Sequence, residues 1–257
     1  VVLTQSDERT LDGAYREEMR PFVHYTPLAG WINDPNGLIF YHGVYHMFYQ
    51  YNPMGIEWGN MHWGHATSRD LFFWKEEDVA LFPDAMGTMY SGSAIEDTRN
   101  VSGLQRGDRP PLLLYYTAAG NGGLLSRGKK RTQCLAVSTD GGKSFAKYEN
   151  NPLVEPLANF NRDPKVVWVE ELSRYVMALY LEGERYALLG SDDLLHWTPF
   201  QEILLGNDAE CPDLFCLEAD GGRFWVFLGA SDKYLVGRFD GGKFVRVSDE
   251  KQLSYSP

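Results

Sequence analysis

The sequence predicts an all-β fold, a propeller of four-stranded blades. No long stretch shows helical periodicity, and glycine and proline punctuate the 257 residues throughout. A unit of four short apolar strands recurs along the chain. An acidic residue close to a proline recurs at the start of three of these units. A chain of this length can form one large all-β domain.

The repeat consists of a short strand, an aspartate turn and an aromatic residue that opens the next strand. The turn aspartates are Asp70, Asp140, Asp193 and Asp240, and the aromatic residues are Trp74, Phe145, Trp197 and Phe244. Two further apolar segments precede each turn strand, which gives four strands per unit. Most units span roughly 40–50 residues, which is typical of propeller blades. The interval from the first aspartate to the second is longer, because it holds an insertion at 96–111 and a glycine-rich loop at 118–128.

The acidic motifs coincide with this repeat. The stretch 33–37 reads Asn-Asp-Pro-Asn-Gly and predicts a tight turn that feeds a strand, although an Asx turn without chemistry would look similar. Asp163 precedes Pro164, and Glu210 lies two residues before Pro212. The first strand of each propeller blade lines the central axis. We therefore expect Asp34, Ser91, Asp163 and Glu210 around one funnel, an arrangement that a β-sandwich would not explain.

Composition and charge narrow the function classes. The chain is 44% hydrophobic and 23% charged, so a packed core is expected and disorder is not. The net charge of −11 disfavours nucleic acid and anionic lipid as partners. No apolar run is long enough to span a bilayer. No signal peptide is visible, so we expect a cytoplasmic protein, or a secreted or periplasmic one whose leader has been removed.

Cysteines and histidines give no clear metal or disulfide pattern. Three cysteines cannot form a complete disulfide framework. Cys211 and Cys216 have no second Cys/His cluster beside them, so we expect no zinc site. His62 and His65 could form a metal pair, but surface or packed strand histidines are the favoured interpretation. We expect neither a metal nor a cofactor.

Several motifs in order resemble glycoside hydrolase family 32, the β-fructofuranosidases: invertases, exo-inulinases and levanases. Residues 31–37 are similar to its W-M-N-D-P-N-G, with Ile32 for Met, and residues 90–94 to its F-S-G-S-A, with Tyr90 for Phe. The R-D-P and E-C-P-D motifs match residues 162–164 and 210–213. The family stretches between them match 50–53, 58–60 and 63–65. The resemblance covers almost everything from Pro21 onward.

The resemblance implies a retaining hydrolase. Asp34 would be the nucleophile, Glu210 the general acid/base, and Asp163 a stabiliser of the transition state that binds fructosyl hydroxyls. A retaining glycosidase needs its two catalytic carboxyl groups about 5–5.5 Å apart. Strand alternation could point Arg162 away from Asp163, and Arg162 could instead fix an acid or a sugar hydroxyl. The pocket for the terminal fructose would be lined by Asn33, Gln50, Trp58, Tyr90, Ser91 and Arg162.

Family members resemble a five-bladed propeller followed by a β-sandwich. We expect a lead-in segment at 1–20 and a propeller catalytic domain at 21–257 with about four blades of this five-bladed type. The fifth blade and the sandwich would be absent. The chain would then be a fragment, or a second chain would complete the ring, or the open propeller edge would be covered otherwise.

The predicted function is release of terminal fructose from sucrose or from fructans such as inulin and levan, by double displacement. The expected partners are small-molecule or oligosaccharide fructosides. Three alternatives stay open: a transfructosylase, a related inverting propeller glycosidase, and a truncated sugar-binding subunit without catalysis.

Overall fold

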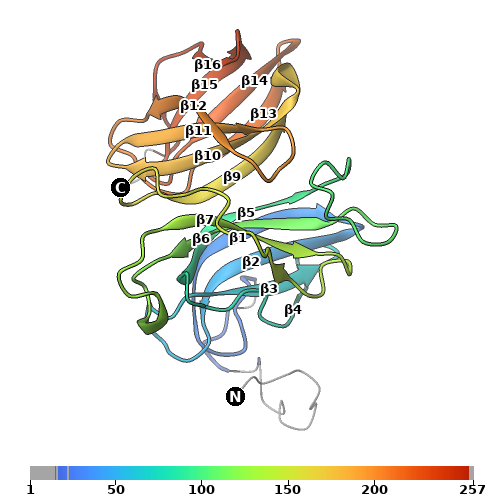
Figure 1. Ribbon diagram of the computed structural model, residues 1–257. Coiled ribbons are helices and arrows are strands. Elements are labelled where there is room, and N and C mark those ends of the chain that lie inside the picture. The colour runs from blue at the N-terminus through green and yellow to red at the C-terminus, as the bar shows by residue number, and fades with distance from the viewer. Residues whose placement is uncertain (1–14, 16, 22, 255–257) are drawn as a thin grey trace.

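Four antiparallel sheets follow one another along the chain in the computed structural model, which describes residues 15, 17–21 and 23–254 (Figure 1). Most of the predicted lead-in segment, residues 1–14 and 16, lies outside the described residues. The first sheet contains β1 (Trp31–Tyr41), β2 (Val44–Asn52), β3 (His62–Ser68) and β4 (Trp74–Glu76). The second contains β5 (Thr88–Glu96), β6 (Leu112–Ala119), β7 (Thr132–Ser138) and β8 (Ala146–Lys147).

The other two sheets repeat this order. The third contains β9 (Arg162–Val169), β10 (Arg174–Glu182), β11 (Arg185–Ser191) and β12 (Thr198–Leu204). The fourth contains β13 (Asp213–Ala219), β14 (Gly222–Leu228), β15 (Lys233–Asp240) and β16 (Lys243–Arg246), and β17 (Lys251–Gln252) pairs with β15. Two 3-10 turns, η1 (Leu124–Ser126) and η2 (Glu170–Leu172), complete the described elements. The all-β propeller with four blades in this chain is confirmed.

Apolar layers between successive sheets form the core. Every residue of β6 is buried, because its two faces contact different sheets. Leu112, Leu114 and Tyr116 pack in the cluster shared with the first sheet. Leu113 and Tyr115 pack in the cluster shared with the third sheet. This period of two is the ordinary alternation of strand side chains, here with both faces covered.

The predicted aspartate turns form in three blades. Asp70 Oδ1 accepts the backbone N–H groups of Phe72 and Phe73, and Asp140 and Asp193 accept equivalent pairs in the second and third blades. The fourth copy differs, because Asp240 pairs directly with Lys243 in a two-residue hairpin. The glycines at 241 and 242 both adopt positive φ, which allows this tighter connection.

The expected turn at 33–37 is wrong. These residues lie inside β1, where the pairing with β2 shifts register between Ile32 and Pro35 and again between Asn36 and Ile39. Proline has no N–H to donate to a ladder, so it is accommodated in a bulged strand rather than in a regular one. Glu210 likewise lies in the loop before β13, not in the strand that the sequence predicted to begin there.

Candidate active site

The innermost strands of neighbouring sheets are tied together by side-chain hydrogen bonds. Ser93 Oγ on β5 donates to Pro164 O at 2.8 Å and accepts from Val166 N at 3.0 Å, which joins β5 to β9. Thr117 Oγ1 on β6 accepts the backbone N–H of Asp163 at 3.0 Å. These bonds fix the start of β9, and therefore Asp163, against the second sheet.

Asp34 is held by two predicted pocket residues. Ser91 Oγ donates to Asp34 Oδ2 at 2.6 Å, and Gln50 Nε2 donates to Ser91 Oγ at 2.6 Å and lies 3.4 Å from Asp34 Oδ2. Ser91 and Gln50 are both buried. The hydroxyl and the amide thus orient one carboxylate oxygen of Asp34 and leave the other free of described partners. Asn33 is exposed beside Asp34, and no described contact joins it to the other predicted residues.

Arg162 connects Glu210 and Asp163. Its Nη2 donates to Glu210 Oε1 at 2.6 Å, and its Nε lies 3.6 Å from Asp163 Oδ2. The guanidinium also lies 4.5 Å from the centre of the Tyr180 ring. Asp163 has a φ of +64°, and the pairing of β9 with β10 shifts register at this point. Strict alternation therefore does not hold at this point, and Arg162 contacts the carboxylates of Glu210 and Asp163, in line with the expectation that it could fix an acid.

Cys211 bridges two of the acids. Its Sγ lies 3.6 Å from Asp34 Oδ2 and 3.6 Å from Asp163 Oδ2, and its backbone N–H donates to Asp163 Oδ2 at 3.0 Å. Burial, followed by the charges of Asp163 and Asp34, raises the pKa of the thiol far above its usual range. The sulfur therefore stays a neutral S–H that can donate to either carboxylate. All three cysteines are unpaired thiols.

Aromatic rings and a second arginine form the rim of the site that contains the three acids. Trp58 is exposed, and its ring contacts that of Tyr90 edge-on at a centroid distance of 6.2 Å. The Arg131 guanidinium lies 5.3 Å from the Tyr90 ring centre and 5.4 Å from that of Phe160. Burial, and then the nearby Arg162, lower the pKa of Arg131. Trp58 and Tyr90 are therefore together, as predicted, and Arg131 is a rim residue that the sequence analysis missed.

Sequence reasoning missed other residues of the site. Thr117 carries no motif signal, because it lies in an ordinary apolar strand far from Asp163 in sequence. Asn36 and Cys211 lie within the motifs at residues 31–37 and 210–213, but the sequence pattern indicated no role for either of them. Asn36 is 2% exposed, its Oδ1 accepts from Gly92 N at 3.4 Å, and its Nδ2 has no partner among the described residues.

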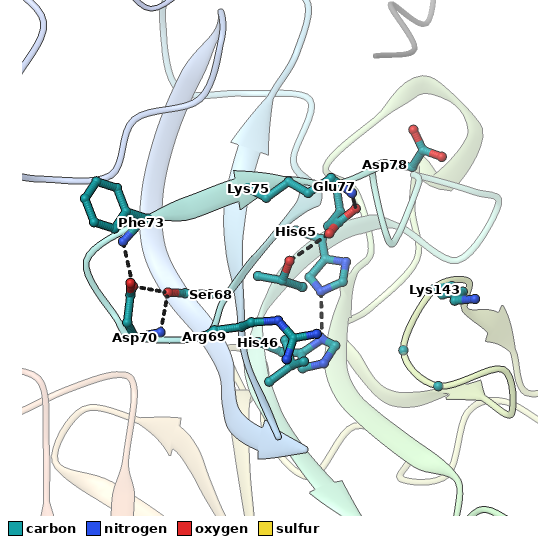
Figure 2. Close-up of a pocket in the computed structure, with 14 residues that line it drawn as sticks. His46, His65, Ser68, Arg69, Asp70, Phe73, Lys75, Glu77, Asp78 and Lys143 are labelled. Carbon is teal, nitrogen blue, oxygen red and sulfur yellow. Dashed lines mark hydrogen bonds and ion pairs between the residues drawn. The ribbon is translucent and has the colours of Figure 1, made fainter. Parts of the chain in front are cut away.

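A separate polar cavity of about 800 Å³ lies toward the other end of the first sheet (Figure 2). His46 and His65 lie in it, stacked, with His46 Nδ1 and His65 Nε2 2.9 Å apart. Burial lowers the pKa of both, that of His65 to about 3, so both rings are neutral. His62 instead bonds Asn60 O. The packed interpretation of His62 and His65 therefore holds. None of the predicted site residues lines this cavity.

The described residues contain neither a metal-binding cluster nor a membrane-spanning helix. Within residues 15, 17–21 and 23–254, no group of three or more His, Cys, Asp or Glu side chains is arranged to hold a metal ion. In the same part of the chain, neither of the short 3-10 turns is long or apolar enough to cross a bilayer.

The charge on Asp163 is expected to lower stability. Burial first, and then Asp34 and Glu210, raise its pKa from 3.8 to about 6, although Cys211 N–H and Arg162 oppose this. A carboxyl whose folded-state pKa is raised destabilises the fold as it ionises, here from about pH 4 to pH 6. Asp163→Asn should therefore raise the free energy of unfolding above pH 7 by up to about 3 kcal/mol.

Urea unfolding of Asp163→Asn and the unchanged chain at a series of pH values from below pH 4 to above pH 7 measures this difference. The gap should close below pH 4, where Asp163 is protonated in both states. Asp192→Asn is the control, because that carboxylate is 82% exposed and should show no such trend. A gap that is the same at every pH would contradict the assigned cause.

Comparisons with known proteins identify the family. Residues 24–255 match the sequence profile of the glycosyl hydrolases family 32 N-terminal domain. The chain is 42% identical to a levanase of Bacillus subtilis over 90% of the chain and 36% of that protein, and 36% identical to an invertase of Schizosaccharomyces pombe over 91% and 43%.

Solved structures agree with this match. A β-fructofuranosidase from Schwanniomyces occidentalis complexed with fructosyl-erythritol superposes with a TM-score of 0.81 at 33% identity, over 91% of this chain and 49% of that chain. An exo-inulinase from Aspergillus awamori superposes with a TM-score of 0.79 at 31% identity, over 92% and 55%. The chain thus spans about a third to a half of the length of these relatives. It belongs to glycosyl hydrolase family 32 and carries that family's N-terminal domain.

Proposed function

We propose that this chain performs the chemistry of a retaining β-fructosidase that releases terminal fructose from sucrose or a fructan. The observation that carries the proposal is the convergence of three acids, Asp34 from the first sheet, Asp163 from the third and Glu210 from the loop that leads into the fourth. Arg162 contacts both Glu210 and Asp163, and the sulfur of Cys211 lies within 3.6 Å of both Asp163 and Asp34. Such a cluster supplies the nucleophile, the proton donor and the stabilising charge that glycoside cleavage needs.

The roles follow from the surroundings of each acid. The free oxygen of Asp34 attacks the anomeric carbon of the fructosyl unit, while Glu210 gives its proton to the departing glycosidic oxygen. Glu210 is half-exposed, so its carboxyl can meet a leaving group and later a water molecule. That water loses its proton to Glu210 and displaces Asp34, which returns both acids to their first state.

Asp163 and the rim residues hold the sugar. Asp163 is fixed by Cys211 N–H and Thr117, so it can accept hydrogen bonds from fructosyl hydroxyls that strengthen as positive charge develops on the ring. Trp58 and Tyr90 offer ring faces at the mouth. Asn33 is an exposed amide within the same strand as Asp34 and would contact hydroxyls as well.

The relatives support fructosides as the substrate class. Solved structures of similar proteins contain fructosyl-erythritol, fructose, sucrose and, at 25% identity, 1-kestose. Each shares a fructosyl group and differs in what is attached to it. The proposal for this chain is therefore recognition of a terminal fructosyl unit, with hydrolysis as the main outcome.

A second chain covering the open propeller edge is also part of the proposal. On β13, Leu214 and Cys216 face the third sheet, and Leu217 points to the other face and is 51% exposed. Across the strands Leu217 pairs with Phe224 and Phe215 with Val226, so this face carries several adjacent apolar residues, and a contiguous apolar patch favours a packing partner. Molar mass from light scattering would test this, and a strict monomer over a range of concentrations would rule out a second copy of the chain.

The stereochemistry of the first product tests the mechanism. Proton NMR during the first minutes of sucrose cleavage should show β-fructofuranose before mutarotation, because two displacements restore the original configuration. The α anomer first would indicate an inverting glycosidase. Larger fructosides formed in place of free fructose would indicate a transfructosylase. Fructose binding by calorimetry without any turnover would indicate a sugar-binding subunit.

A further inference from the structure

The side chain of Glu210 is not held in place by packing against its neighbours. Its side chain is 53% exposed, and its carboxylate has one described partner, Arg162. A general acid must be placed accurately, since a displacement of about 1 Å can cost on the order of 100-fold in rate. The backbone of its loop must therefore supply the accuracy that packing does not.

That backbone is strained. Asn207, Glu210 and Cys211 have φ values of +54°, +65° and +35°. For residues other than glycine, such conformations are unfavourable and persist only where the surroundings enforce them. The loop between β12 and β13 thus needs an anchor that overrides its local preferences.

Asp208 is that anchor. It is 4% exposed and lies two residues before Glu210. Its carboxylate accepts the backbone N–H of Ser231, in the turn between β14 and β15, at 3.1 and 3.2 Å, and that of Lys233, the first residue of β15, at 3.0 Å. Gly229 makes room for it, because a Cβ there would lie 2.1 Å from Asp208 Oδ1.

Tyr186 links this anchor to the third sheet and to Glu210 itself. From β11, its hydroxyl donates to Asp208 Oδ1 at 3.1 Å and lies 3.4 Å from the backbone oxygen of Glu210. Burial, and then the charge of Asp208, raise the pKa of Tyr186, so the phenol keeps its proton and stays a donor. The ring packs against Phe227 at a centroid distance of 5.2 Å, which fixes the hydroxyl.

We propose that Asp208 and Tyr186 are a positioning pair that sets the backbone of Glu210 and thereby aims its carboxyl at the glycosidic oxygen. The pair acts through the backbone and touches no substrate. This inference rests on the proposed function for the role of Glu210. The placement of the loop, however, can be measured without activity.

The test compares Asp208→Asn and Tyr186→Phe with a matched control, Asp97→Asn. Asp97 is also buried and accepts N–H groups of Val101 and Ser102, but it lies just past the C-terminal end of β5, away from Ser91. Asparagine at 208 would turn an amide NH₂ toward backbone donors, which repels them. Tyr186→Phe removes one hydroxyl and tests the pair even if Asp208→Asn folds poorly.

Comparing the rates on two substrates distinguishes a loss of Glu210 positioning from a general loss of folded protein. Sucrose has a poor leaving group that needs the acid, whereas a p-nitrophenyl β-fructofuranoside has a leaving group that needs little protonation. Both site variants should lower kcat on sucrose about 10- to 100-fold, with KM nearly unchanged and the nitrophenyl rate within about threefold. Asp97→Asn should lower thermal stability and leave the ratio of the two rates unchanged.

Hydrogen exchange gives the readout that does not depend on activity. The amides of residues 209–211 should exchange faster in Asp208→Asn and Tyr186→Phe, but not in Asp97→Asn. Equal losses on both substrates, or unchanged exchange at 209–211, would overturn the positioning role. Absence of Asp34-dependent turnover in the unchanged chain would instead refute the proposed function, and the exchange data would still decide where the pair acts.

Discussion

Replacing Asp34 by asparagine is expected to lower kcat on sucrose by at least about 10⁴-fold, equivalent to about 5.5 kcal/mol of lost transition-state stabilisation. An amide oxygen is a far weaker nucleophile than a carboxylate, so the fructosyl-enzyme ester does not form at a useful rate. The fold should be unaffected, because an amide oxygen can still accept the hydrogen bond that Ser91 donates. Initial rates of fructose release and a thermal melt of the same sample measure both expectations.

A matched aspartate makes the result specific. Asp140 belongs to the aspartate turn of the second blade, where it accepts backbone N–H groups of Lys143 and Ser144. Asp140→Asn should change the melting temperature without changing kcat. Turnover by Asp34→Asn within tenfold of the unchanged chain would rule out Asp34 as the nucleophile and would leave the inverting alternative as the better account.

Glu210→Gln is expected to lower kcat on sucrose about 10²- to 10⁴-fold, because the departing oxygen then leaves without a proton. Gln Oε1 can still accept from Arg162 Nη2, so the loop should keep its shape. On a p-nitrophenyl fructoside the first step should survive while the second step loses its base. A burst of nitrophenol followed by a slow steady state should therefore appear in stopped-flow absorbance.

Azide provides the control for Glu210→Gln. It is an anion that attacks without a base, so it should restore steady-state turnover of the aryl substrate and yield a fructosyl azide. It should not restore cleavage of sucrose, whose leaving group still lacks a proton donor. No burst and no response to azide would show that Glu210 is not the acid/base.

Much of the architecture could be predicted because it depends on local patterns. The four-strand units follow from short apolar segments with period two, and β6 and β10 show that period with both faces buried. The Asp70, Asp140 and Asp193 turns form as expected, since an Asx turn needs only its own few residues. The repeat also predicted that Asp34 and Asp163 lie near each other, and the sulfur of Cys211 is 3.6 Å from both carboxylates.

The details at the carboxylates could not be predicted in the same way. Residues 33–37 read as a turn, yet they form the bulged part of β1, because pairing with β2 outweighs the turn preference of Asn-Gly. Strand alternation left open whether Arg162 points away from Asp163 or fixes an acid, and the positive φ of Asp163 brings both side chains to the site. Each outcome is decided by a neighbouring strand that no local pattern contains.

By itself, the sequence determined the all-β class, the repeating unit and the three acidic motifs, since each depends on residues that are close together in the chain. Only the tertiary structure placed Thr117, Arg131, Tyr186 and Asp208 beside these acids. Their partners lie on other strands or across a turn, and a single hydrogen bond between distant segments leaves no trace in spacing or composition. The strained backbone at Glu210 has the same origin, because contacts with two sheets enforce what its local sequence disfavours.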